Sequence, residues 1–226
     1  MNNSVPGRSD LVKYMLRTAL ILGTFAAAGA ALLNFTHENT KDRIAESERQ
    51  YLLKALHELI PSDTHDNDIF SDTFAVISRE LLGSDDYVTI YRARNRGQPT
   101  AVAMTVLAPD GYSGTIKLLV AIRYDGTLIG VRAVSHKETP GLGDAIEANR
   151  SDWIFSFMDR SLSSPAGDLW QVKKDGGAFD QLTGATITSR AVVKAVHNSL
   201  IYYQRSRAAI FAAKATATGT GSSRRH

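Results

Sequence analysis

The chain has 226 residues, of which 43% are apolar and 22% are charged, and this composition is ordinary for a globular protein. Its formal net charge is only +3 and its basic residues are scattered, so no nucleic-acid partner is expected. It contains no cysteine, which excludes disulfides, iron–sulfur ligation and c-type haem attachment in this chain. The length allows one domain of moderate size with appendages.

Residues 18–35 form an apolar stretch without charge that predicts a transmembrane anchor. At about 1.5 Å per residue the stretch spans about 27 Å, close to the thickness of a bilayer core. Basic residues before it favour a cytoplasmic N-terminus for residues 1–17, but others follow at comparable range. The basic residues on the two sides are Arg8, Lys13 and Arg17, then Lys41, Arg43 and Arg49.

A cleaved signal peptide is the alternative interpretation of this stretch. It has a basic start, and Ala28-Gly29-Ala30 fits a cleavage site. Because the apolar run continues to Phe35, an uncleaved anchor is favoured. Both interpretations place the rest of the chain outside the cytoplasm.

Residues 36–62 predict a juxtamembrane helix. Between Asn39 and Ile60 the apolar residues recur near helical spacing among charged ones, and Pro61 ends the pattern. His57 and His65 flank this proline but share no ligand spacing with a third donor, so no metal site is expected. The region from His65 to Ser84 gives no clear pattern.

Strand patterns dominate the next part of the chain. Residues 87–91, 101–107, 116–124 and 127–133 alternate or are rich in β-branched side chains, and Asp125-Gly126 is a strong hairpin signal. A meander of three or four antiparallel strands is predicted. The fold class is therefore α+β, a mainly antiparallel sheet with flanking helices after one N-terminal transmembrane helix.

The segment 135–144 (SHKETPGLGD) predicts a strand that exits into a Pro-Gly turn, with Asp144 capping a short helix. It fits neither a dinucleotide fingerprint nor a P-loop. His136 and Glu138 titrate in a usable range, but nothing places a reacting group beside them, so a structural or tuning role is favoured over acid–base catalysis. Further on, residues 170–177 predict a strand followed by a turn.

The segment 180–188 (DQLTGATIT) is a hydroxyl-rich loop followed by a helical pattern from about Arg190 to Lys214. This places Thr188 and Ser189 at the N-cap, where unpaired N–H groups favour an anion. A phosphate seat is one interpretation, and a plain polar helix cap is the other. Residues 215–226 are predicted to be a disordered tail.

The 180–188 segment resembles the attachment motif D-x-x-[S/T]-G-A-T-x-T of the FMN-binding domain family, in which FMN is joined through its phosphate to the last threonine. The resemblance implies one covalent FMN on Thr188, in a domain of residues 63–214. In the same family H-x-E-T-P-G-L-G forms a wall around the isoalloxazine, and G-Y-x-G-x-I lies near the flavin, as Gly111, Tyr112, Gly114 and Ile116 would. The implied cofactor-binding residues are Thr188, Asp180, Thr183, Gly184, Ala185, Thr186, Glu138, Thr139, Gly141, Leu142 and Gly143.

Threonine is a poor nucleophile, and no Ser–His–Asp arrangement is readable around Thr188. The resemblance therefore implies a separate flavin transferase as a maturation partner.

The order of anchor, helix, strands and the two motifs is similar to that of the G subunits of the Rnf electron-transport complex. The related C subunits of the sodium-pumping NADH:quinone oxidoreductase share the motif and anchor. The resemblance implies a redox relay between membrane subunits of an ion-translocating ferredoxin:NAD oxidoreductase, at the bacterial inner membrane with the FMN domain on the periplasmic side. The alternatives are a C-type subunit of a sodium-pumping NADH:quinone oxidoreductase, a stand-alone flavoenzyme, and a membrane-anchored regulator or scaffold.

Overall fold

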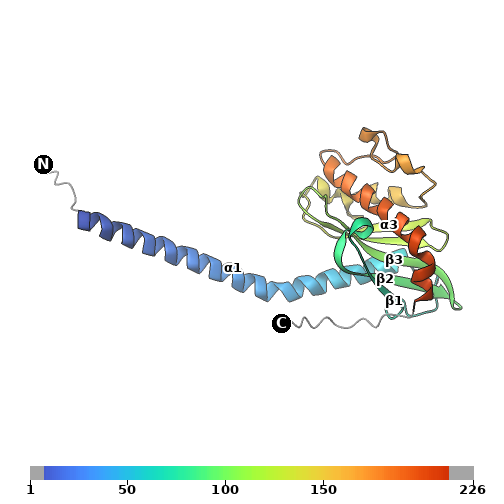
Figure 1. Ribbon diagram of the computed structural model, residues 1–226, viewed down its shortest axis with the longest axis horizontal. Coiled ribbons are helices and arrows are strands. Elements are labelled where there is room, and N and C mark those ends of the chain that lie inside the picture. The colour runs from blue at the N-terminus through green and yellow to red at the C-terminus, as the bar shows by residue number, and fades with distance from the viewer. Residues whose placement is uncertain (1–7, 214–226) are drawn as a thin grey trace. The chain divides into compact units, whose positions relative to one another are not determined.

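The N-terminal part of the chain is one long helix. The computed structural model describes residues 8–213, and helix α1 runs unbroken from Arg8 to Leu59 (Figure 1). The predicted anchor (18–35) and the predicted juxtamembrane helix (36–62) follow one another without a break in this helix, and no proline lies between them. Its end before Pro61 is confirmed. The predicted tail lies outside the described residues.

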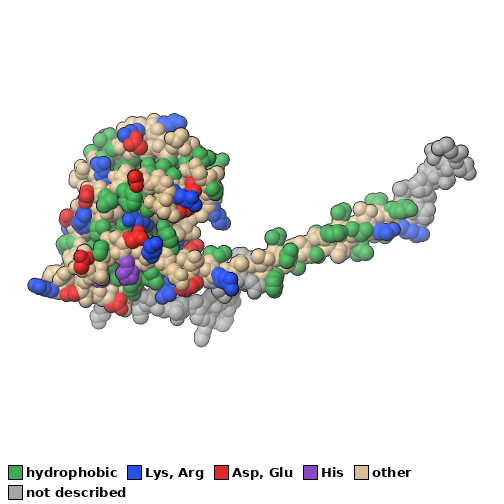
Figure 2. Space-filling view, turned by 180° about the vertical axis from the view of Figure 1, so that it is seen from behind, with side chains coloured by type: hydrophobic (Ala, Val, Ile, Leu, Met, Phe, Trp, Pro, Cys, Tyr) green, Lys and Arg blue, Asp and Glu red, His purple; other side chains and the backbone are tan. Residues whose placement is uncertain are grey.

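The stretch Val12–Thr36 of α1 is long and apolar enough to cross a membrane. Its side chains are exposed, and Figure 2 shows hydrophobic groups along it with basic groups at its N-terminal end. The hydroxyls of Thr24 and Thr36 donate to the carbonyls of Leu20 and Leu32, both at 2.8 Å. These bonds satisfy the hydroxyls within the helix, as an apolar environment requires.

The chain divides into two units after Arg49, and the part from Gln50 onward is built around a five-stranded antiparallel meander. This confirms the α+β fold class. The four predicted strands are present and mostly longer than expected, whereas the first strand and the short helix α2 fell in the unassigned region. The elements are β1 (Thr73–Ser78), α2 (Arg79–Leu82), β2 (Ser84–Asn95), β3 (Gln98–Ala108), β4 (Ile116–Arg123) and β5 (Leu128–Ser135).

Tight turns set the register of the sheet. Asp125-Gly126 joins β4 to β5, as predicted, with Gly126 at φ 98°. Arg96 and Gly97 join β2 to β3 with φ values of 52° and 74°, the pair of positive angles that a type I′ hairpin turn needs.

The last turns of α1 pack against one face of the sheet. Ala55, Leu56 and Leu59 are buried against a face made of small residues. At Gly130 a Cβ atom would lie 2.8 Å from Leu59 Cδ2, so a side chain there would force the leucine side chain to move. The small residues on this face are Ala93, Ala101, Ala103 and Ala121.

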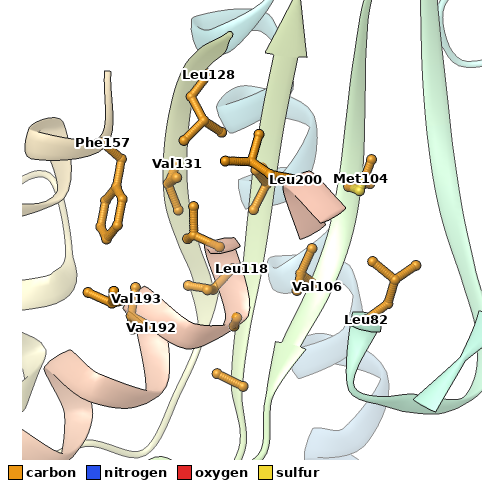
Figure 3. Close-up of a cluster of buried hydrophobic side chains, with 14 of the residues drawn as sticks. Leu82, Met104, Val106, Leu118, Leu128, Val131, Phe157, Val192, Val193 and Leu200 are labelled. Carbon is orange, nitrogen blue, oxygen red and sulfur yellow. The ribbon is translucent and has the colours of Figure 1, made fainter. Parts of the chain in front are cut away.

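The opposite face is covered by helix α3 (Thr186–Ala212) and by short 3-10 segments (Figure 3). Alternate residues of β3 and β4 point into this larger core, as the period of a strand requires. The predicted strand at 170–177 is absent. That segment makes one isolated bridge, between Val172 and Phe179, and then the 3-10 helix η4 (Lys173–Asp175).

His197 of α3 lies flat on Trp170, with ring centroids 5.2 Å apart and an interplanar angle of 5°. Burial lowers the pKa of His197, because the charged imidazolium loses hydration there. As pH falls through about 6.5, the unfolded chain therefore takes up this proton more readily than the folded chain, and folding stability decreases.

We expect His197→Phe, which keeps an aromatic ring on Trp170 but cannot be protonated, to flatten the loss of stability between about pH 7 and pH 5. The measurement is the free energy of unfolding in urea at several pH values. His57→Gln, at an exposed histidine, is the control for losing a histidine. An equal pH dependence in His197→Phe and wild type would contradict this interpretation.

Candidate functional site

A pocket of about 470 Å³ lies where the loop after β5 meets the start of α3. Its volume is within the range of about 300–1,000 Å³ that is typical of small-molecule sites. Two segments far apart in the sequence supply nearly all of its wall. The lining residues are Tyr112, Glu138, Thr139, Leu142, Gly143, Gly184, Ala185, Thr186, Ile187 and Thr188.

The structure brings together most of the residues singled out in the sequence. Of that set only Asp180, Thr183 and Gly141 do not line the pocket. Asp180 is exposed and pairs with Lys173 at 2.7 Å, while its carbonyl accepts a 2.6 Å hydrogen bond from the indole of Trp153. Asp180 thus fixes the course of the loop before the pocket.

Two lining residues were outside the predicted binding set. Tyr112 and Ile187 are both exposed, 68% and 48%, and give the pocket an apolar rim. Tyr112 carried a signal, because it lies in the segment that resembles G-Y-x-G-x-I. Ile187 had none, because it occupies a variable position of the attachment motif, and a single exposed isoleucine is not by itself a sign of binding.

Helix α3 begins earlier than predicted. Its first residue is Thr186 and its N-cap is Ala185, so the expectation that Thr188 and Ser189 form the cap is wrong. Ser189 points back instead: its hydroxyl donates to the Ala185 carbonyl and accepts from the Leu182 N–H, both at 3.0 Å. The backbone N–H groups of the first turn, from Thr186 to Thr188, have no intrahelical acceptor and border the pocket.

The other wall of the pocket is a turn in which two backbone N–H groups donate to the same carbonyl. The N–H groups of Leu142 and Gly143 donate to the carbonyl of Thr139 at 3.1 and 3.0 Å. The 3-10 helix η1 (Gly143–Ile146) follows, with Leu142 as its N-cap, so the predicted capping role of Asp144 is wrong. Asp144 lies inside that helix and is 3.8 Å from Arg150.

Glycines let the two walls approach each other. A Cβ atom on Gly143 would lie 2.8 Å from Glu138 Cβ and 3.2 Å from the Thr188 hydroxyl. Gly184 has a φ of 77° and faces Leu142, whose Cδ2 would be 3.0 Å from a Cβ atom there. Side chains at these positions would fill the space beside Thr188, so the glycines keep it open to a ligand.

The centre of the pocket is a contact that the sequence does not reveal. Glu138 and Thr188, 50 residues apart, are only 4% and 1% exposed, and the threonine hydroxyl donates a short hydrogen bond to Glu138 Oε2. The other carboxylate oxygen, Oε1, accepts from the N–H of Ser113 at 3.0 Å. Both oxygens of the carboxylate are therefore held, and its direction is fixed.

A second hydrogen-bonded pair, His136 and Glu147, positions the backbone of Glu138. The backbone N–H of Glu138 donates to His136 Nδ1 at 3.2 Å, and His136 Nε2 lies 2.9 Å from a carboxylate oxygen of Glu147. With Nδ1 accepting, the proton of a neutral His136 is on Nε2, where it donates to Glu147. His136 and Glu147 thus hold the backbone that carries Glu138, and neither contacts Thr188.

The arrangement suits a phosphorylated ligand with an extended apolar part. Unpaired N–H groups at a helix start carry about half a positive charge and favour an anion. Next to them the pocket offers a hydroxyl that can be esterified, two glycines that admit a group beside it, and an apolar rim. Among the side chains that the structure describes, no cluster of three His, Asp or Glu residues could hold a metal ion.

Comparison with known proteins identifies the domain. Residues 111–201, which contain the whole pocket, match the FMN-binding domain family, and residues 1–59 match the RnfG N-terminal region. The antiparallel sheet, the pocket at the start of α3 and the apolar N-terminal helix therefore define a membrane-anchored protein of the FMN-binding class.

Its relatives narrow the class further. The chain is 48% identical to the G subunit of the ion-translocating oxidoreductase complex of Pseudomonas aeruginosa, over 88% of this chain and 92% of that protein. It is 45% identical to the corresponding G subunit of Vibrio atlanticus, over 87% and 93%. It is 43% identical to that of Shewanella amazonensis, over 88% and 93%. The chain belongs to the family of G subunits of ion-translocating oxidoreductase complexes, which confirms the resemblance seen in the sequence.

Proposed function

We propose that this chain is an electron-carrier subunit of an ion-translocating oxidoreductase complex of the ferredoxin:NAD type, and that it works through a single FMN joined by a phosphoester to Thr188. The observation that carries the proposal is the position of the Thr188 hydroxyl. It lies in the first turn of α3, at the wall of a pocket that fits a phosphorylated ligand. Membership of the G-subunit family supports the role in electron transfer.

The residues of the pocket have separable roles in this proposal. The N–H groups of Thr186, Ile187 and Thr188 stabilise the phosphate charge, by about 0.3–1 kcal/mol for a helix start. Leu142, Tyr112 and Ile187 provide apolar surface for the isoalloxazine. Bound FMN supplies the redox chemistry, and the protein supplies position and electrostatics. The covalent bond prevents loss of a cofactor that changes its charge repeatedly.

The proposed setting is the bacterial inner membrane, with the helix stretch Val12–Thr36 as a single-pass anchor and the FMN domain on the periplasmic side. Three basic residues before this stretch or near its start favour a cytoplasmic N-terminus. Other integral membrane and redox subunits of the complex are the electron donor and acceptor, and a flavin transferase attaches the cofactor.

The test is to produce the full chain together with its flavin transferase. Flavin fluorescence should remain on the denatured polypeptide in a gel, and peptide mass spectrometry should place one FMN on Thr188. Thr188→Val should abolish both signals, whereas Thr183→Ser, which keeps a hydroxyl in the same loop, should be labelled like wild type. Labelling of Thr188→Val, or a wild-type chain of unmodified mass, would refute the proposal.

A second experiment distinguishes a relay from a stand-alone enzyme. The native protein should co-purify with integral membrane subunits and lose electron transfer when separated from them. An isolated chain that turned over a soluble substrate unaided would contradict the relay.

A further inference from the structure

Attachment of a phosphate to Thr188 requires that its hydroxyl lose a proton. A threonine hydroxyl is a weak nucleophile until an adjacent base accepts that proton. Among the described side chains, Glu138 is the titratable group that forms a hydrogen bond with this hydroxyl. Its Oε2 is the acceptor, and the bond from Ser113 to Oε1 holds the carboxylate in that orientation.

We propose that Glu138 is the catalytic base for flavin attachment, an inference that rests on the proposed phosphoester at Thr188. Glu138 Oε2 accepts the proton of the Thr188 hydroxyl as Thr188 Oγ1 forms a bond to the flavin phosphorus. The phosphate donor is a flavin phosphate activated as a phosphoanhydride. Its bridging P–O bond breaks, and the leaving phosphate departs with that electron pair.

The charges of the product support the same assignment. A phosphodiester at Thr188 carries one negative charge, and an ionised Glu138 in contact with it would be a buried pair of like charges. If Glu138 keeps the proton it has taken from Thr188, the carboxyl group is neutral and donates a hydrogen bond to an ester or phosphate oxygen. One proton transfer thus activates the nucleophile and removes the repulsion.

The other titratable groups around the pocket are already engaged elsewhere. His136 accepts from the backbone N–H of Glu138 and pairs with Glu147, and Asp144 lies beside Arg150. Tyr112 lines the rim and is exposed. Glu58 is a matched control: it is a glutamate of the same domain whose carboxylate pairs with Arg132 at 3.3 Å, and it does not line the pocket.

The experiment measures attachment directly. Full-length chain without flavin is incubated with its purified transferase and a flavin dinucleotide, and the intact mass is followed in time. We expect Glu138→Gln, which keeps the size of the side chain, to lower the maximal rate by about 10²-fold, since general base catalysis typically contributes 10²–10⁴-fold. The concentration of chain at half-maximal rate should stay unchanged, because the surface met by the transferase is the same. Glu58→Gln should react at close to the wild-type rate.

Two further measurements test the same assignment, and the second needs no variant. Glu138→Asp, which keeps a carboxylate but withdraws it by one methylene, should gain flavin more slowly than wild type and faster than Glu138→Gln. Infrared spectra should show a protonated carboxyl band in the flavin-bearing wild-type protein that is absent before attachment.

The outcomes separate this inference from the proposed function. Wild-type rates in a folded Glu138→Gln, together with no labelling of Thr188→Val, would overturn the role of Glu138 and leave the attachment site standing. Absence of the carboxyl band from the flavin-bearing wild type would overturn the retained proton. Labelling of Thr188→Val would instead refute the attachment site itself.

Discussion

Asp72→Asn is expected to lower the free energy of unfolding by about 3 kcal/mol, because it leaves a buried arginine without its counter-charge. Arg92 is 1% exposed, and its Nη2 lies 2.5 Å from Asp72 Oδ1. The second oxygen of Asp72 is 2.8 Å from Nε of Arg94. A single carboxylate therefore balances two guanidinium groups, and asparagine would remove that charge while keeping the shape of the side chain.

The two arginines matter because they hold the end of helix α3. Nη1 of Arg92 donates to the carbonyls of Ile210 and Ala213, both at 2.7 Å, and Nη2 of Arg94 donates to the carbonyl of Phe211 at 3.0 Å. These are carbonyls at a helix C-terminus, which lack intrahelical donors and favour positive charge. Loss of Asp72 thus loosens the helix whose other end forms the pocket.

Asp159→Asn is the matched control. Asp159 also pairs with an arginine at 2.8 Å, but the side chains of Asp159 and Arg123 are 71% and 44% exposed. Exposed pairs of this kind contribute about 0–1 kcal/mol. Urea unfolding of the full chain in detergent, followed by tryptophan fluorescence, measures both variants, because both tryptophans, Trp153 and Trp170, lie in the folded domain. Equal losses of unfolding free energy in the two variants would contradict the proposed role of Asp72.

Local sequence pattern predicted four of the five strands and missed β1, at one edge of the sheet. The hairpin at Asp125-Gly126 and the strands around it follow from period-two alternation and turn chemistry, both of which act over a few residues. Strand β1 was not predicted because it is short and lies at an edge of the sheet. Its pairing with β2, rather than its own hydrophobic pattern, defines it as a strand.

The candidate site, like the fold, could be predicted from the sequence only in part. The segments that wall the pocket were identified by resemblance, and eight of the eleven predicted residues line it. The hydrogen bond between Glu138 and Thr188 was not predictable, because it joins residues 50 positions apart whose meeting depends on how β5 and α3 pack. The start of α3 was placed too late because the hydroxyls of Thr188 and Ser189 fit a capping pattern, while Ala185 in fact precedes the first turn.

Gly143→Ala is expected to slow flavin attachment by about 10²-fold, the same order as removal of the base, although it changes no functional group. The added Cβ atom would lie 2.8 Å from Glu138 Cβ and 2.9 Å from Glu138 Oε2. Atoms cannot remain that close, so the carboxylate must move away from the Thr188 hydroxyl, which would itself be 3.2 Å from the new methyl group. Proton transfer depends on hydrogen-bond contact, and a shift of this size breaks it.

The substitution is informative because it separates geometry from chemistry. Glu138 and Thr188 both remain, and Gly143 has no positive φ that alanine would strain, so we expect the domain to fold with a loss of about 1–3 kcal/mol from overpacking. Gly167→Ala is the control, because a Cβ atom there meets nothing within 4 Å. The readouts are the rate of mass gain with transferase and flavin dinucleotide, and thermal unfolding of the same samples. A folded Gly143→Ala that gains FMN at the wild-type rate would show that contact between Glu138 and Thr188 is not needed for attachment.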